Sequence, residues 1–101
     1  MIEGQKQERF AELFPLLILF IQATGHTVRI GDVWAKIGHI RNSYHYRKLA
    51  ADLNVFKDGV YLDQTIQYEP FGTFWMSLDP MCVWGGDFGD GGHFSMWEGK
   101  E

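Results

Sequence analysis

The chain has 101 residues, of which 46% are hydrophobic and 16% aromatic, so it can build the core of one folded domain, 1–101, and disorder is excluded. Its net charge of −4 provides no basic surface for nucleic acid and no attraction to anionic lipid. The single cysteine, Cys82, excludes an internal disulfide and a Cys-x-x-Cys zinc knuckle, so any metal site must use His, Asp and Glu.

The N-terminal segment 2–23 is predicted to form a helix, because apolar residues recur at three- and four-residue steps between Phe10 and Ile21. Further apolar residues widen that face, so we expect the second half of the helix to be buried nearly all round. Pro15 is expected to kink the helix or to start a second one. The residues that widen the apolar face are Leu16, Leu19 and Phe20.

The apolar run 13–21 within this segment is too short to span a bilayer as a helix, although its length suits the apolar part of a signal peptide. The residues before it carry three glutamates beside one lysine and one arginine, and no small-residue cleavage site follows. We therefore predict a buried helix, no clear signal peptide and no stable membrane insertion. An export signal is the alternative interpretation.

The rest of the chain alternates short strands with turn signals and one helix. In 49–56, Leu49, Ala51, Leu53 and Val55 fall on one face of a predicted strand, and Asp52 falls on the other. The further predicted elements are a strand within 26–34, a loop at 36–42, a hairpin at 57–59 with return strand 60–62, a helix in the second half of 65–78, a strand at 81–84, a glycine-dense loop at 85–92 and a strand at 93–96. The pattern predicts an α+β fold with a small, mainly antiparallel sheet and flanking helices.

Two histidines and two aspartates are the candidate metal site, which we place at the sheet face. His45, Asp52 and His93 can hold one Zn²⁺ and leave its fourth position open, the arrangement of a catalytic site. Asp90, three residues before His93 across two glycines, would be a carboxylate near the ion that acts as general base. Zinc lowers the pKa of a bound water molecule to about 7, so a hydroxide nucleophile is available at neutral pH. Taken singly, each residue is more often a solvated histidine, a turn aspartate or a backbone-bonded aspartate.

The spacing S-x-H-x(6)-D, followed by Trp-Gly-Gly-Asp and D-x-x-H, resembles zinc peptidases that cut peptidoglycan stem peptides. These are the D-alanyl-D-alanine carboxypeptidases and the phage L-alanyl-D-glutamate endopeptidases (endolysins), and the similarity covers residues 27–96. The resemblance implies a catalytic part at about 26–96, in which His45, Asp52 and His93 ligate zinc and Asp90 is the catalytic base. It also implies that Ser43 orients His45 and that the stretch Trp84, Gly85, Gly86 and Asp87 shapes the wall beside the metal.

The chain departs from this family where many members carry an arginine that binds the substrate carbonyl or a carboxylate. Lys36, Arg41 or Arg47 could supply that positive charge, and at least two of them are expected to be solvated surface charges. Many members also have glycine in the place of Lys48.

The expected function is that of a monomeric phage or prophage L-alanyl-D-glutamate endopeptidase whose partner is the peptidoglycan stem peptide. Such a protein is made in the host cytoplasm and acts at the bacterial cell wall or periplasm during lysis. The alternatives are a D-alanyl-D-alanine carboxypeptidase or dipeptidase, and a non-catalytic metal-binding phage protein of the same fold.

Overall fold

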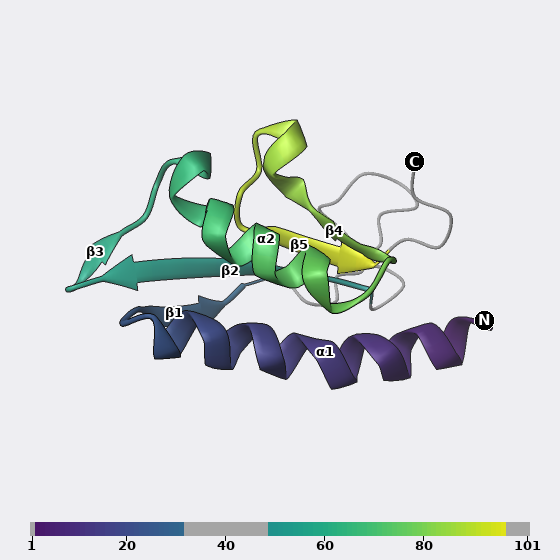
Figure 1. The fold of residues 1–101 in the computed structure, drawn as a ribbon. Helices are drawn as coiled ribbons and strands as arrows, with labels where there is room; N and C mark the ends of the chain where they lie inside the picture. Colours follow the sequence, from purple (N-terminus) through teal and green to yellow (C-terminus); the bar gives the residue numbers. More distant parts are fainter. Residues whose placement is uncertain (1, 32–48, 97–101) are drawn as a thin grey trace.

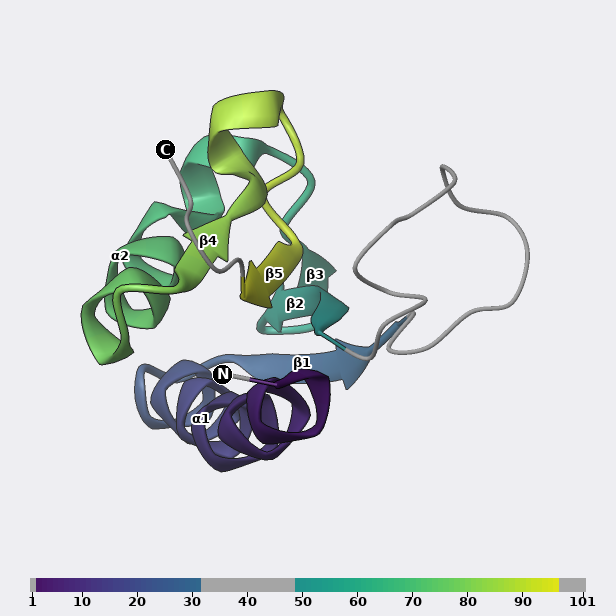
Figure 2. The same ribbon diagram turned by 90° about the vertical axis from the view of Figure 1, so that its right-hand side faces the viewer.

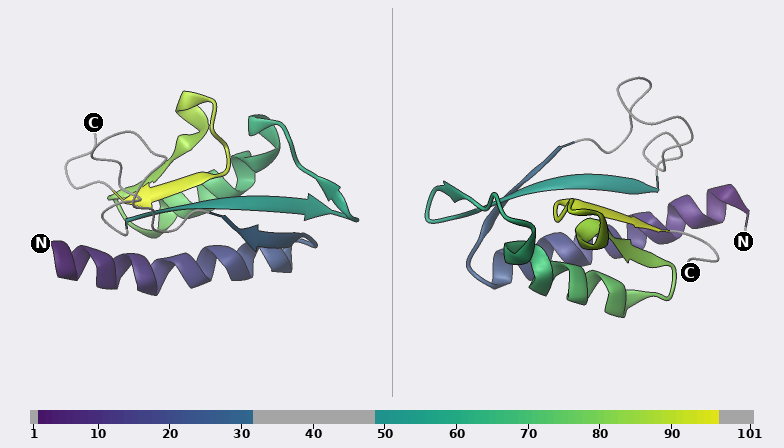
Figure 3. Two further views of the ribbon diagram at one scale, coloured as in Figure 1. Left: turned by 180° about the vertical axis from the view of Figure 1, so that it is seen from behind. Right: turned by 90° about the horizontal axis from the view of Figure 1, so that it is seen from above.

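One long helix and one short helix pack against the same face of an antiparallel sheet (Figure 1). The computed structural model describes residues 2–31 and 49–96. The helices are α1 (Glu3–Ala23) and α2 (Glu69–Leu78), and Figure 3 shows both on one side of the sheet when it is viewed from above. The strands are β1 (Thr27–Ile30), β2 (Ala50–Lys57), β3 (Val60–Tyr61), β4 (Cys82–Trp84) and β5 (His93–Met96). The predicted α+β class with a mainly antiparallel sheet is confirmed.

The sheet has the order β1-β2-β5-β4, and β3 forms a hairpin with β2. Asp58 and Gly59 connect β2 to β3 with φ values of 51° and 80°. A two-residue hairpin turn of this kind needs positive φ at both positions, which is the reason that Asp-Gly predicts it from the sequence. Two 3₁₀ turns complete the chain, η1 (Thr65–Tyr68) before α2 and η2 (Gly85–Phe88) after β4.

The core lies between the helices and one face of β2 and β5. Figure 2 shows α1 and α2 on the same side of these strands. Ala51, Leu53 and Val55 alternate along β2 and are fully buried, which confirms the face predicted for this strand. Trp75 of α2 packs edge-on against Phe10 of α1, with 5.7 Å between the ring centroids. Side chains on the opposite face of β2, including Asp52, therefore point away from the core.

The prediction that the second half of the N-terminal helix is buried nearly all round was wrong, and so was the alternative that Pro15 starts a second helix. α1 continues through Pro15 as one helix, and the expected kink stays a prediction. Pro15 has no N–H group, so the carbonyl of Ala11 lacks its helical hydrogen bond. Both residues are exposed, so water can bond to that carbonyl. The second half is not buried all round, because Leu16 and Leu19 are 43% and 61% exposed on the side away from the sheet. In the described part of the chain, no helix has both the length and the apolar character needed to cross a bilayer.

Candidate metal centre

Asp52 and His93 face each other across two adjacent strands. They are directly paired in the antiparallel register of β2 and β5, although 41 positions separate them along the chain. Because the neighbouring Ala51 and Leu53 are buried in the core, alternation turns Asp52 to the other face, where His93 also lies. The distance from His93 Nδ1 to Asp52 Oδ1 is 3.2 Å. Strand register alone therefore brings a carboxylate and an imidazole together.

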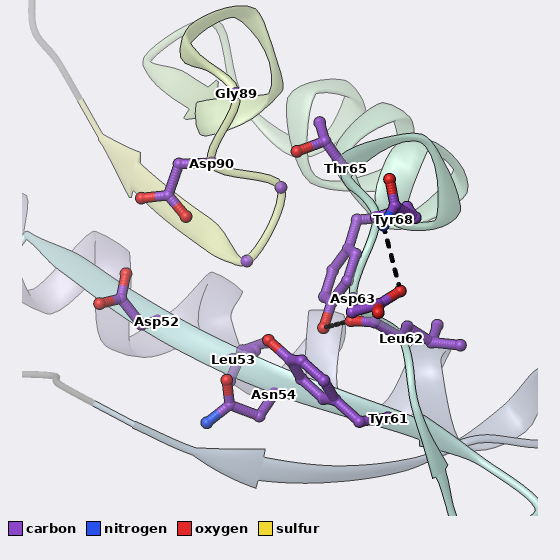
Figure 4. Close-up of a pocket in the computed structure, with 13 residues that line it drawn as sticks. Asp52, Leu53, Asn54, Tyr61, Leu62, Asp63, Thr65, Tyr68, Gly89 and Asp90 are labelled. Carbon is purple, nitrogen blue, oxygen red and sulfur yellow. Dashed lines mark hydrogen bonds between the residues drawn. The ribbon is translucent and has the colours of Figure 1, made fainter.

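Asp90 joins this pair from the loop that precedes β5. One ligand atom from each of Asp52, Asp90 and His93 lies within 4.8 Å of the other two. We call these three residues the Asp–His cluster. Figure 4 shows the carboxylates of Asp52 and Asp90 facing each other, one from the strand and one from the loop. Asp90 is exposed, whereas Asp52 and His93 are half-buried, so the open side of the cluster is the side of Asp90.

Close backbone contacts fix the loop that carries Asp90. Gly92 accepts a hydrogen bond from Leu53 N at 2.8 Å, and a Cβ at Gly92 would lie 2.6 Å from the Leu53 carbonyl oxygen. The Asp90 carbonyl accepts a hydrogen bond from His93 N at 3.2 Å, which closes the turn. At Gly85 a Cβ would overlap that same carbonyl oxygen. Glycine is therefore required at Gly85 and Gly92 for the loop to approach β2 so closely.

Trp84 supports the same loop by one hydrogen bond and by close packing against two glycines. Its Nε1 donates a hydrogen bond to the Gly91 carbonyl at 2.7 Å. Its ring lies against Gly72 of α2 and Gly86 of η2, and a Cβ at either glycine would overlap it. Trp84 thus connects α2 to the backbone between Asp90 and His93. Trp84 is not among the residues that line the pocket described below, so its predicted role as a wall of the site stays a prediction.

A pocket of about 260 Å³ opens beside the cluster where the edge of β2 has no strand partner. β5 pairs with residues 50–52 of this edge and β3 pairs with residues 56–57, so a gap remains between them. The lining comes from residues 52–54, 61–65, 68 and 89–92. Asp52 and Asp90 belong to this lining, so the pocket and the Asp–His cluster share one wall.

The Tyr68 hydroxyl occupies the gap in the strand ladder. It accepts a hydrogen bond from Val55 N at 3.1 Å and donates one to the Leu62 carbonyl at 2.9 Å. The side chain is 3% exposed, and burial raises the pKa of its phenol to about 12, so the hydroxyl keeps its proton at neutral pH. Tyr68 thereby links β2 to the segment after β3, and it lines the pocket between them.

The structure brings together three of the four residues predicted for the metal chemistry. His45, the remaining predicted zinc ligand, lies outside the described residues, as do Ser43 and Arg41 and the alternatives Lys36 and Arg47. Asp90, predicted as a base beside the ion, lies close enough to be a ligand itself. Asp87 is exposed on η2 and is not part of the pocket lining, so its role stays a prediction.

Sequence reasoning did not find Tyr61, Asp63 or Tyr68 as pocket residues. The hairpin signal at Asp58-Gly59 places the start of the β2–β3 pairing, but nothing in the sequence shows that the pairing stops after two residues of β3. The polar hydroxyl of Tyr68 in an otherwise apolar position was the one available signal.

The Asp–His cluster fits a small divalent ion. Two ligand atoms that are each about 2.1 Å from zinc and at the tetrahedral angle lie about 3.4 Å apart. The separation of 3.2 Å between His93 and Asp52 is close to that value. Two carboxylates and one imidazole suit zinc and also other divalent ions. The described residues therefore lie close enough to hold a metal ion, and they do not select the metal.

A search against protein-family models finds no match for this chain, and a search of curated proteins finds no significant match to its sequence.

Proposed function

We propose that this protein is a zinc-dependent hydrolase of peptidoglycan stem peptides, and that it acts as a phage or prophage L-alanyl-D-glutamate endopeptidase. The observation that carries the proposal is the position of the Asp90 carboxylate beside the cross-strand pair of Asp52 and His93, within 4.8 Å and at the edge of a pocket. The D-x-x-H spacing of Asp90 and His93 agrees with the resemblance described above.

In the proposed reaction, Asp52 and His93 hold the zinc ion, together with the predicted ligand His45. When bound, zinc would lower the pKa of water and polarise the scissile carbonyl. Asp90 takes the proton from the attacking water and passes it to the leaving amine, so it acts first as general base and then as general acid. Its exposure allows direct contact with a substrate, and the backbone hydrogen bonds of Asp90 to Gly85 and His93 hold its loop in position.

The pocket supports a peptide substrate because most of its lining is polar. Asn54, Gln64 and Thr65 offer amide and hydroxyl groups that can bond to peptide N–H and C=O groups. At about 260 Å³ the pocket is below the usual size range of ligand sites, so it suits one or two residues of a peptide while the rest of the polymer stays outside.

The test is a digest of purified peptidoglycan with zinc-loaded protein, with detection of new amino groups and mass spectrometry of the products. Wild type should expose the amino group of D-glutamate, and Asp90→Ala should lose the activity while it still folds. Asp58→Asn is the matched control, because this aspartate is exposed on the hairpin turn, outside the cluster and the pocket lining. No release by wild type, or equal release by Asp90→Ala, would refute the proposal. Release of terminal D-alanine instead would identify a carboxypeptidase.

A second candidate is a metal-binding phage protein without catalysis, and the position of Asp90 favours it. A carboxylate close enough to ligate can occupy the ion's open coordination position, which a catalytic site must leave for water or substrate. Tight zinc binding by wild type, weakened by Asp90→Ala, with no cleavage of any stem peptide, would support this candidate.

A further inference from the structure

The pocket has two chemically different ends. Asp52 and Asp90 form one end, and Figure 4 shows Asp63 on the opposite side, beyond the rings of Tyr61 and Tyr68. In the proposed metal centre, the two charges of a divalent ion would offset the carboxylates of Asp52 and Asp90. Asp63 would then be the one lining carboxylate in the described chain whose charge the ion does not offset.

The surroundings of Asp63 contain acceptors and an aromatic face. Its carboxylate accepts a hydrogen bond of 3.4 Å from the side-chain amide of Gln64, and no cationic residue is among its partners in residues 2–31 and 49–96. Tyr61, two positions earlier, also lines the pocket and is 47% exposed. The described lining contains no lysine or arginine, so nothing there would repel a positive charge.

A carboxylate and an exposed aromatic ring in one polar pocket are the groups that recognise an ammonium ion. The carboxylate supplies charge and hydrogen-bond acceptors, and the ring face attracts a cation by its quadrupole. An anion would be repelled by Asp63, and a purely apolar group would leave the amide and hydroxyl groups of the lining without partners.

We propose that the Asp63 side of the pocket binds a primary ammonium group of the substrate, such as the side-chain amine of a diamino acid in a stem peptide. The choice of a stem peptide rests on the proposed function, and the choice of the Asp63 end rests on the proposed metal ion at the other end, whereas the preference of the lining for a positive charge rests on the pocket itself. An amine held at Asp63 would fix which residues of the peptide reach the Asp–His cluster, and so would select the bond that is cut.

The test uses two small probes that lack the scissile bond. Nα-acetyl-lysine methylamide carries a free side-chain amine, and the same molecule acetylated at that amine carries no charge. Each is titrated into the zinc-loaded full chain, and binding is followed by NMR shifts of the backbone amides of residues 61–65. Acetylation should weaken binding about two- to fivefold, the range for a solvent-exposed ion pair, and 1 M salt should reduce this preference.

Asp63→Asn should remove the preference for the free amine, and Asp58→Asn should keep it, because both variants lose one exposed carboxylate but only Asp63 lines the pocket. Equal binding of the two probes by wild type, an unchanged preference in Asp63→Asn, or failure of both probes to bind would each overturn the inference. A protein that discriminates between the probes but does not cut peptidoglycan would refute the proposed function and leave this inference standing. Cleavage of peptidoglycan by a protein that does not discriminate between the probes would support the proposed function and refute this inference.

Discussion

Gly72→Ala should destabilise the protein even though it places a better helix former inside α2. Alanine is favoured over glycine by about 0.8–1.0 kcal/mol in a helix interior. At Gly72, however, the added Cβ would overlap the Trp84 ring, which is confined on its other side by Gly86. Insertion of a methyl group into a packed site costs about 1–3 kcal/mol. The clash therefore outweighs the gain in helix propensity.

The displacement of Trp84 should also reach the metal centre. If the ring moves, Nε1 loses its 2.7 Å hydrogen bond to the Gly91 carbonyl, which costs a further 0.5–1.5 kcal/mol or so. Together the three effects give a net loss of about 0.5–3.7 kcal/mol in the free energy of unfolding. Because Gly91 lies between Asp90 and His93, we also expect weaker zinc binding.

Urea denaturation measures the loss, and Gly4→Ala is the matched control. Gly4 lies in α1 with nothing within 4 Å of an added Cβ, so that variant should gain up to about 1 kcal/mol. A double-mutant cycle with Trp84→Ala isolates the clash, because alanine removes the ring atoms that the added Cβ would overlap, and the cost of Gly72→Ala should shrink in the Trp84→Ala background. If Gly72→Ala proves as stable as wild type, or its cost does not depend on Trp84, the packing argument is wrong.

Three further predictions concern the metal centre and two buried hydroxyls. His93→Ala should weaken zinc binding at least about tenfold in competition with a chromophoric chelator, and unchanged affinity would exclude His93 as a ligand. Tyr68→Phe should cost about 1–3 kcal/mol at pH 7, because Val55 N loses its acceptor. The pKa of Tyr68 is raised to about 12 in the folded protein, so the stability that its neutral phenol contributes is complete below pH 10 and is lost as the pH rises through 12. Between pH 10 and pH 12, the free energy of unfolding of wild type should therefore fall by about 2–3 kcal/mol more than that of Tyr68→Phe. Parallel pH profiles of the two proteins would contradict this prediction. Ser95→Ala should raise the free energy of unfolding by about 1 kcal/mol in urea denaturation, because the buried Ser95 hydroxyl has no hydrogen-bond partner within the described structure. A lower free energy of unfolding in this variant would show that the hydroxyl has a partner.

Local sequence patterns predicted those parts of the fold that depend on a few neighbouring residues. The alternation of Ala51, Leu53 and Val55 gave the buried face of β2, and Asp58-Gly59 gave the hairpin. A helix can continue through a proline such as Pro15 where water can reach the freed carbonyl, and that depends on tertiary packing. The exposure of Leu16 and Leu19 likewise depends on how much surface the sheet can cover.

The candidate site was predictable as a set of residue types but not as a cavity. The sequence positions of Asp52, Asp90 and His93 do not show that these residues are in contact. The register of β2 and β5, which pairs Asp52 with His93, is needed for that. The pocket depends on the pairing of β2 with β3, which stops after two residues, and on Tyr68, whose hydroxyl bonds to the unpaired part of β2. Both features arise from contacts between elements. His45, Ser43 and Arg41 lie outside the described residues and stay predictions.

In the proposed metal centre, the pairing of Asp52 with His93 would make metal binding and folding parts of one equilibrium. Because the two donors belong to adjacent strands, they come together only when β2 and β5 are paired, and an ion held by both ties the middle of the chain to its C-terminal strand. A ligand that binds only the folded state adds about 2.7 kcal/mol of stability at a hundred times its dissociation constant. For a chain of 101 residues this is a large part of the total stability. The melting temperature should therefore report the free metal concentration, and the protein should be most easily unfolded where metal is scarce.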